Sequence, residues 1–190
     1  MLTIKIFYVI IFLESEVFIM SKGTRILNKA ISNELSAFGI KKAVCGDEYS
    51  YDFDKEVVTF KEREDGIEDV WFTEFIQERF GYEVRYPFIM SLLHEVGHHK
   101  ANDDVVGSVY EFCLAEKERI AYETMATDDE ETAKALTWQY FNLPDEIMAT
   151  AWAVNYARKH PKKIKKMWKK MRSALVDFYA KNNIRDFLEE

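Results

Sequence analysis

The chain has 190 residues, of which 48% are hydrophobic and 31% are charged, and its net charge is −7. This composition is typical of a globular protein and argues against intrinsic disorder, and the acidic balance argues against nucleic-acid binding by the chain as a whole. The two cysteines, Cys45 and Cys113, form no CxxC pair. That spacing excludes a cysteine-based zinc ribbon and is typical of free thiols in a reducing compartment.

The first 13 residues are strongly apolar, with Lys5 as the single charge. This run is too short to cross a bilayer as a helix, so no stable membrane span is expected. We interpret residues 1–19 as an extension and residues 20–190 as one domain, which ends in a basic helix (158–181). A packed strand and an export or membrane signal are the alternatives for the extension. A cytoplasmic location is expected unless the extension is such a signal.

The first half of the chain mixes the apolar spacing of helices with the alternation of strands. Glycines at 39 and 81 are placed to end two of the helices. The predicted elements are a helix over 22–38, a strand over 40–45, a β-hairpin over 49–60, a helix over 67–80 and a short strand over 82–86.

The second half reads as helical throughout. Pro87 suits the first turn of a helix, where its missing N–H costs nothing, and Asn142-Leu143-Pro144-Asp145 interrupts the pattern. A polar link at Asn102-Asp103-Asp104 separates the first two helices. The predicted helices cover 87–101, 106–125, 130–141, 145–159 and 161–181. The chain is therefore predicted to be an α+β protein, mostly helical, with a small sheet before residue 87.

One pentapeptide carries recognisable chemistry: residues 94–98 read His-Glu-Val-Gly-His. On a helix, positions i and i+4 lie about 40° apart in projection, so His94 and His98 can bind one metal ion. Glu95 is then placed to take a proton from a metal-bound water, which zinc brings to a pKa of about 7. This is the HExxH arrangement of metallopeptidases. Gly97 removes side-chain bulk, which lets another backbone approach the helix.

A catalytic zinc site usually takes three protein ligands, so one more must come from elsewhere. His99 lies about 140° around the helix from His94 and should miss the metal. His160 is distant, beside Pro161, and is expected to be a solvated helix-end residue. A carboxylate from the following helix is the better candidate. That helix offers Glu111, Glu116, Glu118 and Glu123.

The stretches LLHEVGHH and EKERIAYETMA resemble the ImmA/IrrE-type metallopeptidases, over about residues 40–155. That resemblance implies a zincin-like fold and a gluzincin site, in which a glutamate is the third zinc ligand. Members of the family have a Glu-x-x-Ala pattern on the helix after the motif. Glu118-Arg119-Ile120-Ala121 matches it, so Glu118 carries over as the ligand by that match. The family commonly has Asp or Asn after the alanine, where this chain has Tyr122.

The resemblance implies a zinc-dependent endopeptidase with Glu95 as general base, Zn²⁺ held by His94, His98 and Glu118, and a protein substrate. The expected substrate is a DNA-binding repressor of the kind found in phages and mobile elements. The alternative is a non-catalytic zinc-containing binding module that docks a protein or nucleic acid through the basic C-terminal helix. A metal-dependent hydrolase of a non-peptide substrate is a third hypothesis. The sequence leaves the oxyanion-stabilising group open between a tyrosine and His160.

Overall fold

The computed structural model describes residues 21–61, 67–101 and 107–181. The expectations for residues 1–19 and for the link at 102–104 lie outside the described residues. Within them, no helix is both long enough and apolar enough to cross a membrane. The cytoplasmic location stays a prediction.

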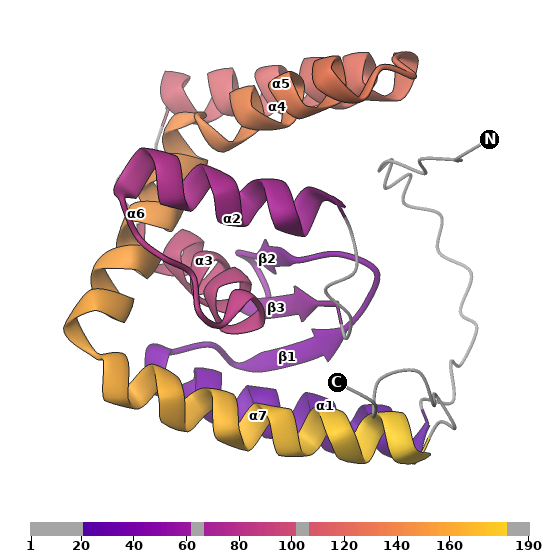
Figure 1. Ribbon diagram of the computed structural model, residues 1–190, viewed down its shortest axis with the longest axis vertical. Coiled ribbons are helices and arrows are strands. Elements are labelled where there is room, and N and C mark those ends of the chain that lie inside the picture. Colours follow the sequence, from indigo (N-terminus) through magenta and orange to yellow (C-terminus); the bar gives the residue numbers. More distant parts are fainter. Residues whose placement is uncertain (1–20, 62–66, 102–106, 182–190) are drawn as a thin grey trace.

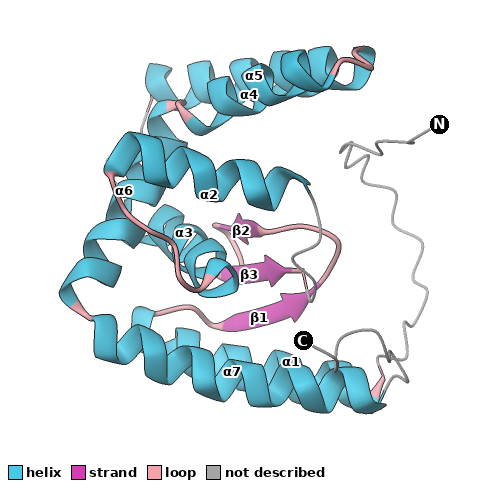
Figure 2. Cartoon of the chain, viewed as in Figure 1, coloured by secondary structure: helices cyan, strands magenta, loops and turns pink. Residues whose placement is uncertain are grey.

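The described elements follow the predicted order closely (Figure 2). The predicted strand over 82–86 is wrong, because these residues form a loop that leads into Pro87. The elements are α1 (Lys22–Leu35), the 3₁₀ turn η1 (Ser36–Phe38), β1 (Lys42–Cys45), β2 (Ser50–Asp52), β3 (Val57–Phe60), α2 (Ile67–Phe80), α3 (Pro87–Ala101), α4 (Ser108–Ala126), α5 (Glu130–Phe141), α6 (Pro144–Lys159) and α7 (Pro161–Lys181). The protein is thus α+β and mostly helical, as predicted.

Local side-chain chemistry explains several of the helix boundaries. Ser21 caps α1 by accepting a hydrogen bond from the backbone N–H of Thr24. Asp129 caps α5 in the same way, accepting from the N–H of Thr132. Gly39 ends the first helical segment with a φ of 96°, a left-handed conformation that glycine adopts at little cost.

The sheet has three strands in the order β1-β3-β2. The hairpin predicted over 49–60 is present, with β2 antiparallel to β3 and Tyr51 opposite Val58. β1 pairs in parallel with β3, in a register that puts Ala43 beside Val58. The hairpin therefore leaves β2 at one edge of the described sheet, with β1 at the other.

The main core lies between the sheet and the helices on its two sides. α1 packs on β1 and against α7, while α3 lies on the other side against β2 and β3 (Figure 1). Leu27, Ile31, Val58 and Leu92 are fully buried there. α7 turns Ile164, Met167 and Met171 into this core and leaves its lysines exposed, so it is an amphipathic helix packed on the protein.

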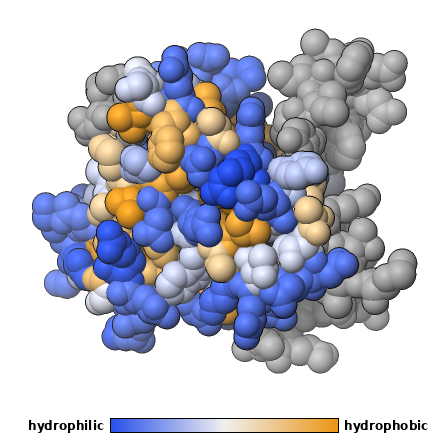
Figure 3. All heavy atoms as spheres, turned by 90° about the horizontal axis from the view of Figure 1, so that it is seen from above, coloured by the Kyte–Doolittle hydropathy of each residue, from blue (hydrophilic) through white to orange (hydrophobic). Residues whose placement is uncertain are grey.

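Helices α4 and α5 pack against each other at the end of the molecule farthest from α7 (Figure 1). A smaller core made of Cys113, Ile120, Leu136 and Leu143 lies beneath them. Apolar side chains also remain on the surface of α4, and apolar residues are visible among charged ones on this face (Figure 3). The exposed large apolar residues of α4 are Val109, Tyr110, Phe112, Leu114, Tyr122 and Met125.

Candidate metal centre

The site is built where α3 and α6 cross. A Cβ atom added at Gly97 would lie 2.3 Å from the carbonyl oxygen of Ala149 and 2.7 Å from its Cα atom. No side chain fits in that space, so the glycine at 97 is what lets the two helix backbones approach so closely. The close packing predicted for Gly97 is confirmed, and it sets the face of α6 directly against the HExxH turn of α3.

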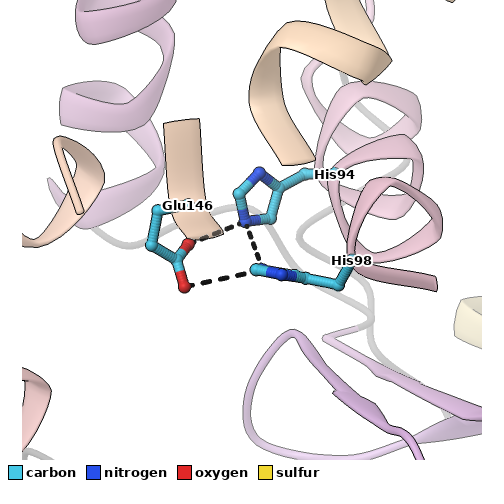
Figure 4. Close-up of side chains that lie close together, drawn as sticks. All are labelled: His94, His98 and Glu146. Carbon is cyan, nitrogen blue, oxygen red and sulfur yellow. Dashed lines mark hydrogen bonds and ion pairs between the residues drawn. The ribbon is translucent and has the colours of Figure 1, made fainter. Parts of the chain in front are cut away.

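Three side chains converge at this crossing (Figure 4). The Nε2 atoms of His94 and His98 lie 3.1 Å apart. Glu146, from the first turn of α6, puts Oε2 2.9 Å from Nε2 of His94 and Oε1 3.5 Å from Nε2 of His98. In the described part of the chain, the ligand atoms of these three side chains lie close enough together to hold one metal ion.

The spacing and the chemistry of the three groups fit zinc. Zinc bonds of about 2.0–2.2 Å in a tetrahedron put neighbouring donor atoms about 3.3–3.6 Å apart, and imidazole nitrogen and carboxylate oxygen are ordinary zinc ligands. Nε2 of His98 and Oε2 of Glu146 lie 3.1 Å and 2.9 Å from Nε2 of His94, a few tenths of an ångström below this range, so a slight spreading of the side chains would seat the ion. All three residues have low solvent exposure, which limits competition from bulk water.

Thr150 fixes the orientation of the first histidine. Its Oγ1 lies 2.9 Å from Nδ1 of His94, and Thr150 is fully buried. A metal ligand requires the tautomer in which Nδ1–H donates to this hydroxyl and the lone pair of Nε2 is left for the ion; without an ion, Nε2 is the nitrogen that hydrogen-bonds Glu146. Phe72 from α2 packs edge-on against the same imidazole, with ring centroids 5.2 Å apart. The ring of His94 is therefore held on both sides.

Glu146 is 2% exposed, and one lysine and two imidazoles lie against its carboxylate. Burial by itself would raise its pKa, but His98 and Lys117, together with hydrogen bonds from the two imidazoles, hold the pKa well below the usual range. Lys117 comes from α4 and places its Nζ atom 2.5 Å from Oε1 of Glu146. The same Nζ lies 2.5 Å from Oδ2 of Asp145.

Glu95 is also buried, at 5% exposure, and it lines the same cavity as the histidines. Burial raises the pKa of its carboxyl to about 7; His94 opposes that rise, and the charge of Glu146 adds to it. Such a carboxyl can exchange a proton near neutral pH.

A cavity of about 610 Å³ opens over these groups. Its floor holds His94, Glu95 and Glu146, and its walls come from the β2 segment on one side and from α4 and α5 on the other. Tyr140 is half-buried and lines it, and desolvation raises the pKa of its hydroxyl well above the usual value. The site is therefore reachable by a ligand much larger than water.

The structure brings a different carboxylate to the histidines than the one expected from the sequence. The carboxylate beside the histidines belongs to Glu146, and Glu118 is an exposed residue of α4 that lines the cavity without joining the histidine pair. The alternatives Glu116 and Glu123 form ion pairs with Arg119, both at 2.8 Å. Glu111 is exposed in the first turn of α4. The physical reason is that α4 packs mainly on α5, whereas α3 packs most extensively on α6.

A sequence signal for Glu146 was present. Glu146-Ile147-Met148-Ala149 repeats the Glu-x-x-Ala pattern, and its alanine is the residue that contacts Gly97. The third ligand was expected on the helix directly after the motif, whereas this second match lies one α-hairpin further along the chain. Thr150 was missed as well, and only its contact with His94 identifies it.

The two remaining histidines lie away from the centre, as predicted. Nδ1 of His99 lies 2.6 Å from the hydroxyl of Tyr51, on the side of α3 that faces the sheet. His160 ends α6 and packs against the ring of Tyr156, with centroids 4.5 Å apart. It does not line the described cavity, whereas Tyr140 does.

Comparison with protein-family models, with curated proteins and with solved structures finds no match to this chain.

Proposed function

We propose that this protein is a zinc-dependent endopeptidase of the gluzincin class, similar to the ImmA/IrrE-type metallopeptidases. The observation that carries the proposal is the convergence of His94, His98 and Glu146 in one buried group, with Glu95 beside it in the same cavity. Two imidazoles and a glutamate leave a fourth zinc position open, which is the arrangement of catalytic zinc sites.

The residues of the chain have separate tasks in this proposal. His94, His98 and Glu146 would hold the ion, and Thr150 orients His94. A bound zinc ion supplies a Lewis acid that activates water and polarises a carbonyl group. Glu95 takes the proton from the attacking water and returns it to the leaving amine, a role that suits a buried carboxyl.

The shape of the site favours an extended peptide as substrate. β2 is an edge strand of the described sheet, and its residues Ser50 and Tyr51 line the cavity. A peptide segment that lies along an edge strand can pair with its backbone groups, whatever its side chains are. A protein partner, with a DNA-binding repressor as the example that the family resemblance suggests, is consistent with such an opening.

The test is a comparison of wild type with Glu95→Gln. Both proteins should bind one zinc ion per chain, because the ligands are unchanged. Incubated with a peptide mixture from a digested proteome and read by mass spectrometry, wild type should generate new termini at a rate about 10²–10⁴-fold higher than the variant. Equal cleavage by both proteins, or a wild type that retains no zinc after dialysis, would rule the proposal out.

A rival function rests on α7. From Arg158, near the end of α6, to Arg172 the chain has nine Lys and Arg residues and no acidic one, and the lysines among them are exposed. Lys170 forms an ion pair with Glu34 of α1. A non-catalytic module that docks an acidic protein or nucleic acid through this face would show binding abolished by neutral substitutions on α7 and unaffected by Glu95→Gln.

A further inference from the structure

A lysine side chain lies at the centre, although neither the HExxH motif nor the three proposed ligands call for one. Lys117 extends from α4 to the start of α6, where its Nζ atom lies between Oδ2 of Asp145 and Oε1 of Glu146, at 2.5 Å from each. Its side chain is only 25% exposed and lines the cavity. Removing the charged ammonium group from water costs free energy, and its attraction to the two carboxylates offsets that cost.

The two oxygens of Glu146 have different partners as a result. Oε1 accepts a charge-assisted hydrogen bond from Lys117, whereas Oε2 lies 2.9 Å from Nε2 of His94. A carboxylate can bind a metal through one oxygen or through both. An ammonium group on Oε1 competes for that oxygen by charge and by occupancy, and it leaves Oε2 as the oxygen available to an ion.

We propose that Lys117 is a positioning residue that restricts Glu146 to one-oxygen coordination and so keeps a position on the metal free for water or substrate. This inference rests on the proposed metal site. From the sequence, α4 was expected to contribute a metal ligand. In this inference α4 contributes a cation, which controls how Glu146 coordinates the metal. The positive charge also repels the bound ion, so it weakens metal binding while it keeps the centre open.

The experiment substitutes Lys117→Met, a neutral side chain of similar length, in the full chain. Arg119→Met is the matched control, because it removes a cation from the same helix whose ion pairs, with Glu116 and Glu123, lie outside the metal group. Circular dichroism and thermal unfolding of the metal-free proteins establish that each variant folds. Co²⁺ is then titrated in, and its visible absorption is recorded, because four-coordinate Co²⁺ absorbs much more strongly than five-coordinate Co²⁺.

Wild type and Arg119→Met should give the strong four-coordinate spectrum with equal affinity. Lys117→Met should bind Co²⁺ and Zn²⁺ on the order of tenfold more tightly, with a weaker spectrum because both oxygens of Glu146 now coordinate. Any peptidase activity should fall at the same time. Tighter binding with lower activity separates this role from a merely structural one, since a damaged site would bind metal more weakly.

An unchanged spectrum and affinity in Lys117→Met, or weaker binding, would overturn the inference and leave the proposed function standing. If Lys117→Met does not fold, Lys117→Gln takes its place. It keeps a donor for Oε1 but no charge, so tighter binding is still expected and equal or weaker binding contradicts the inference. A wild type that binds Co²⁺ and shows the Lys117 effect, yet cleaves no peptide, would overturn the proposed function alone. A wild type that binds no Co²⁺ overturns both.

Discussion

Helices α4 and α6 carry the same Glu-x-x-Ala pattern in different surroundings. In α6 the alanine of the pattern, Ala149, is fully buried against Gly97, and Glu146 one turn earlier reaches both histidines. In α4 the corresponding Ala121 is half-buried on the wall of the cavity, and Glu118 is exposed. A glutamate in this pattern becomes a candidate ligand only where its alanine lets the helix lie directly on the HExxH helix.

The largest effect should come from exchanging the two glutamates for glutamine, one at a time. Glu146→Gln removes the proposed anionic ligand and should weaken zinc binding by more than about 100-fold, beyond the effect typical of residues that only support a ligand. Glu118→Gln, the matched change on α4, should leave zinc affinity within about twofold of wild type, because no metal ligand depends on it. Zinc titration against a chromophoric chelator measures both. If Glu118→Gln lost zinc and Glu146→Gln retained it, Glu118 and not Glu146 would be the metal-binding glutamate.

The next largest effect should come from a substitution at the crossing of α3 and α6. Gly97→Ala forces a Cβ atom into the backbone of Ala149, so α3 and α6 must separate. Alanine is the better helix former by about 1 kcal/mol, but overpacking of this kind costs about 1–3 kcal/mol or more, and the contact with backbone puts this case at the upper end. We expect a net fall in the free energy of unfolding, measured by urea denaturation, together with weaker zinc binding. A variant more stable than wild type would show that the helices do not touch here.

The smallest effect should come from removing the hydroxyl group that orients His94. Thr150→Val keeps the size of the side chain and removes the hydroxyl that lies 2.9 Å from Nδ1 of the imidazole. Loss of such a partner typically costs about 10–100-fold in metal affinity or activity, and we expect about tenfold in zinc affinity. Thr150→Ser keeps the hydroxyl and is the control, with affinity close to wild type. Equal affinities for the valine and serine variants would mean that the hydroxyl does not orient the ring.

Most of the elements were predictable because their signals are local. The apolar spacing of α1 and α2, the proline that begins α3 and the acidic cap of α5 all act within a few residues. The loop at 82–86 shows where this fails. The residues alternate like a strand, but no strand of the described sheet pairs with them, and a strand needs a partner to form.

The chain by itself determined the pair of histidines and the neighbouring Glu95, because an i, i+4 spacing on a helix brings two side chains to one face whatever surrounds it. Tertiary structure alone decided the third carboxylate, the hydroxyl behind His94 and the lysine beside Glu146. Glu146 lies 52 residues after His94, and Lys117 comes from a helix of a different packing layer. Which of many glutamates meets the histidines depends on where two helix backbones can approach, and here a glycine facing an alanine set that point.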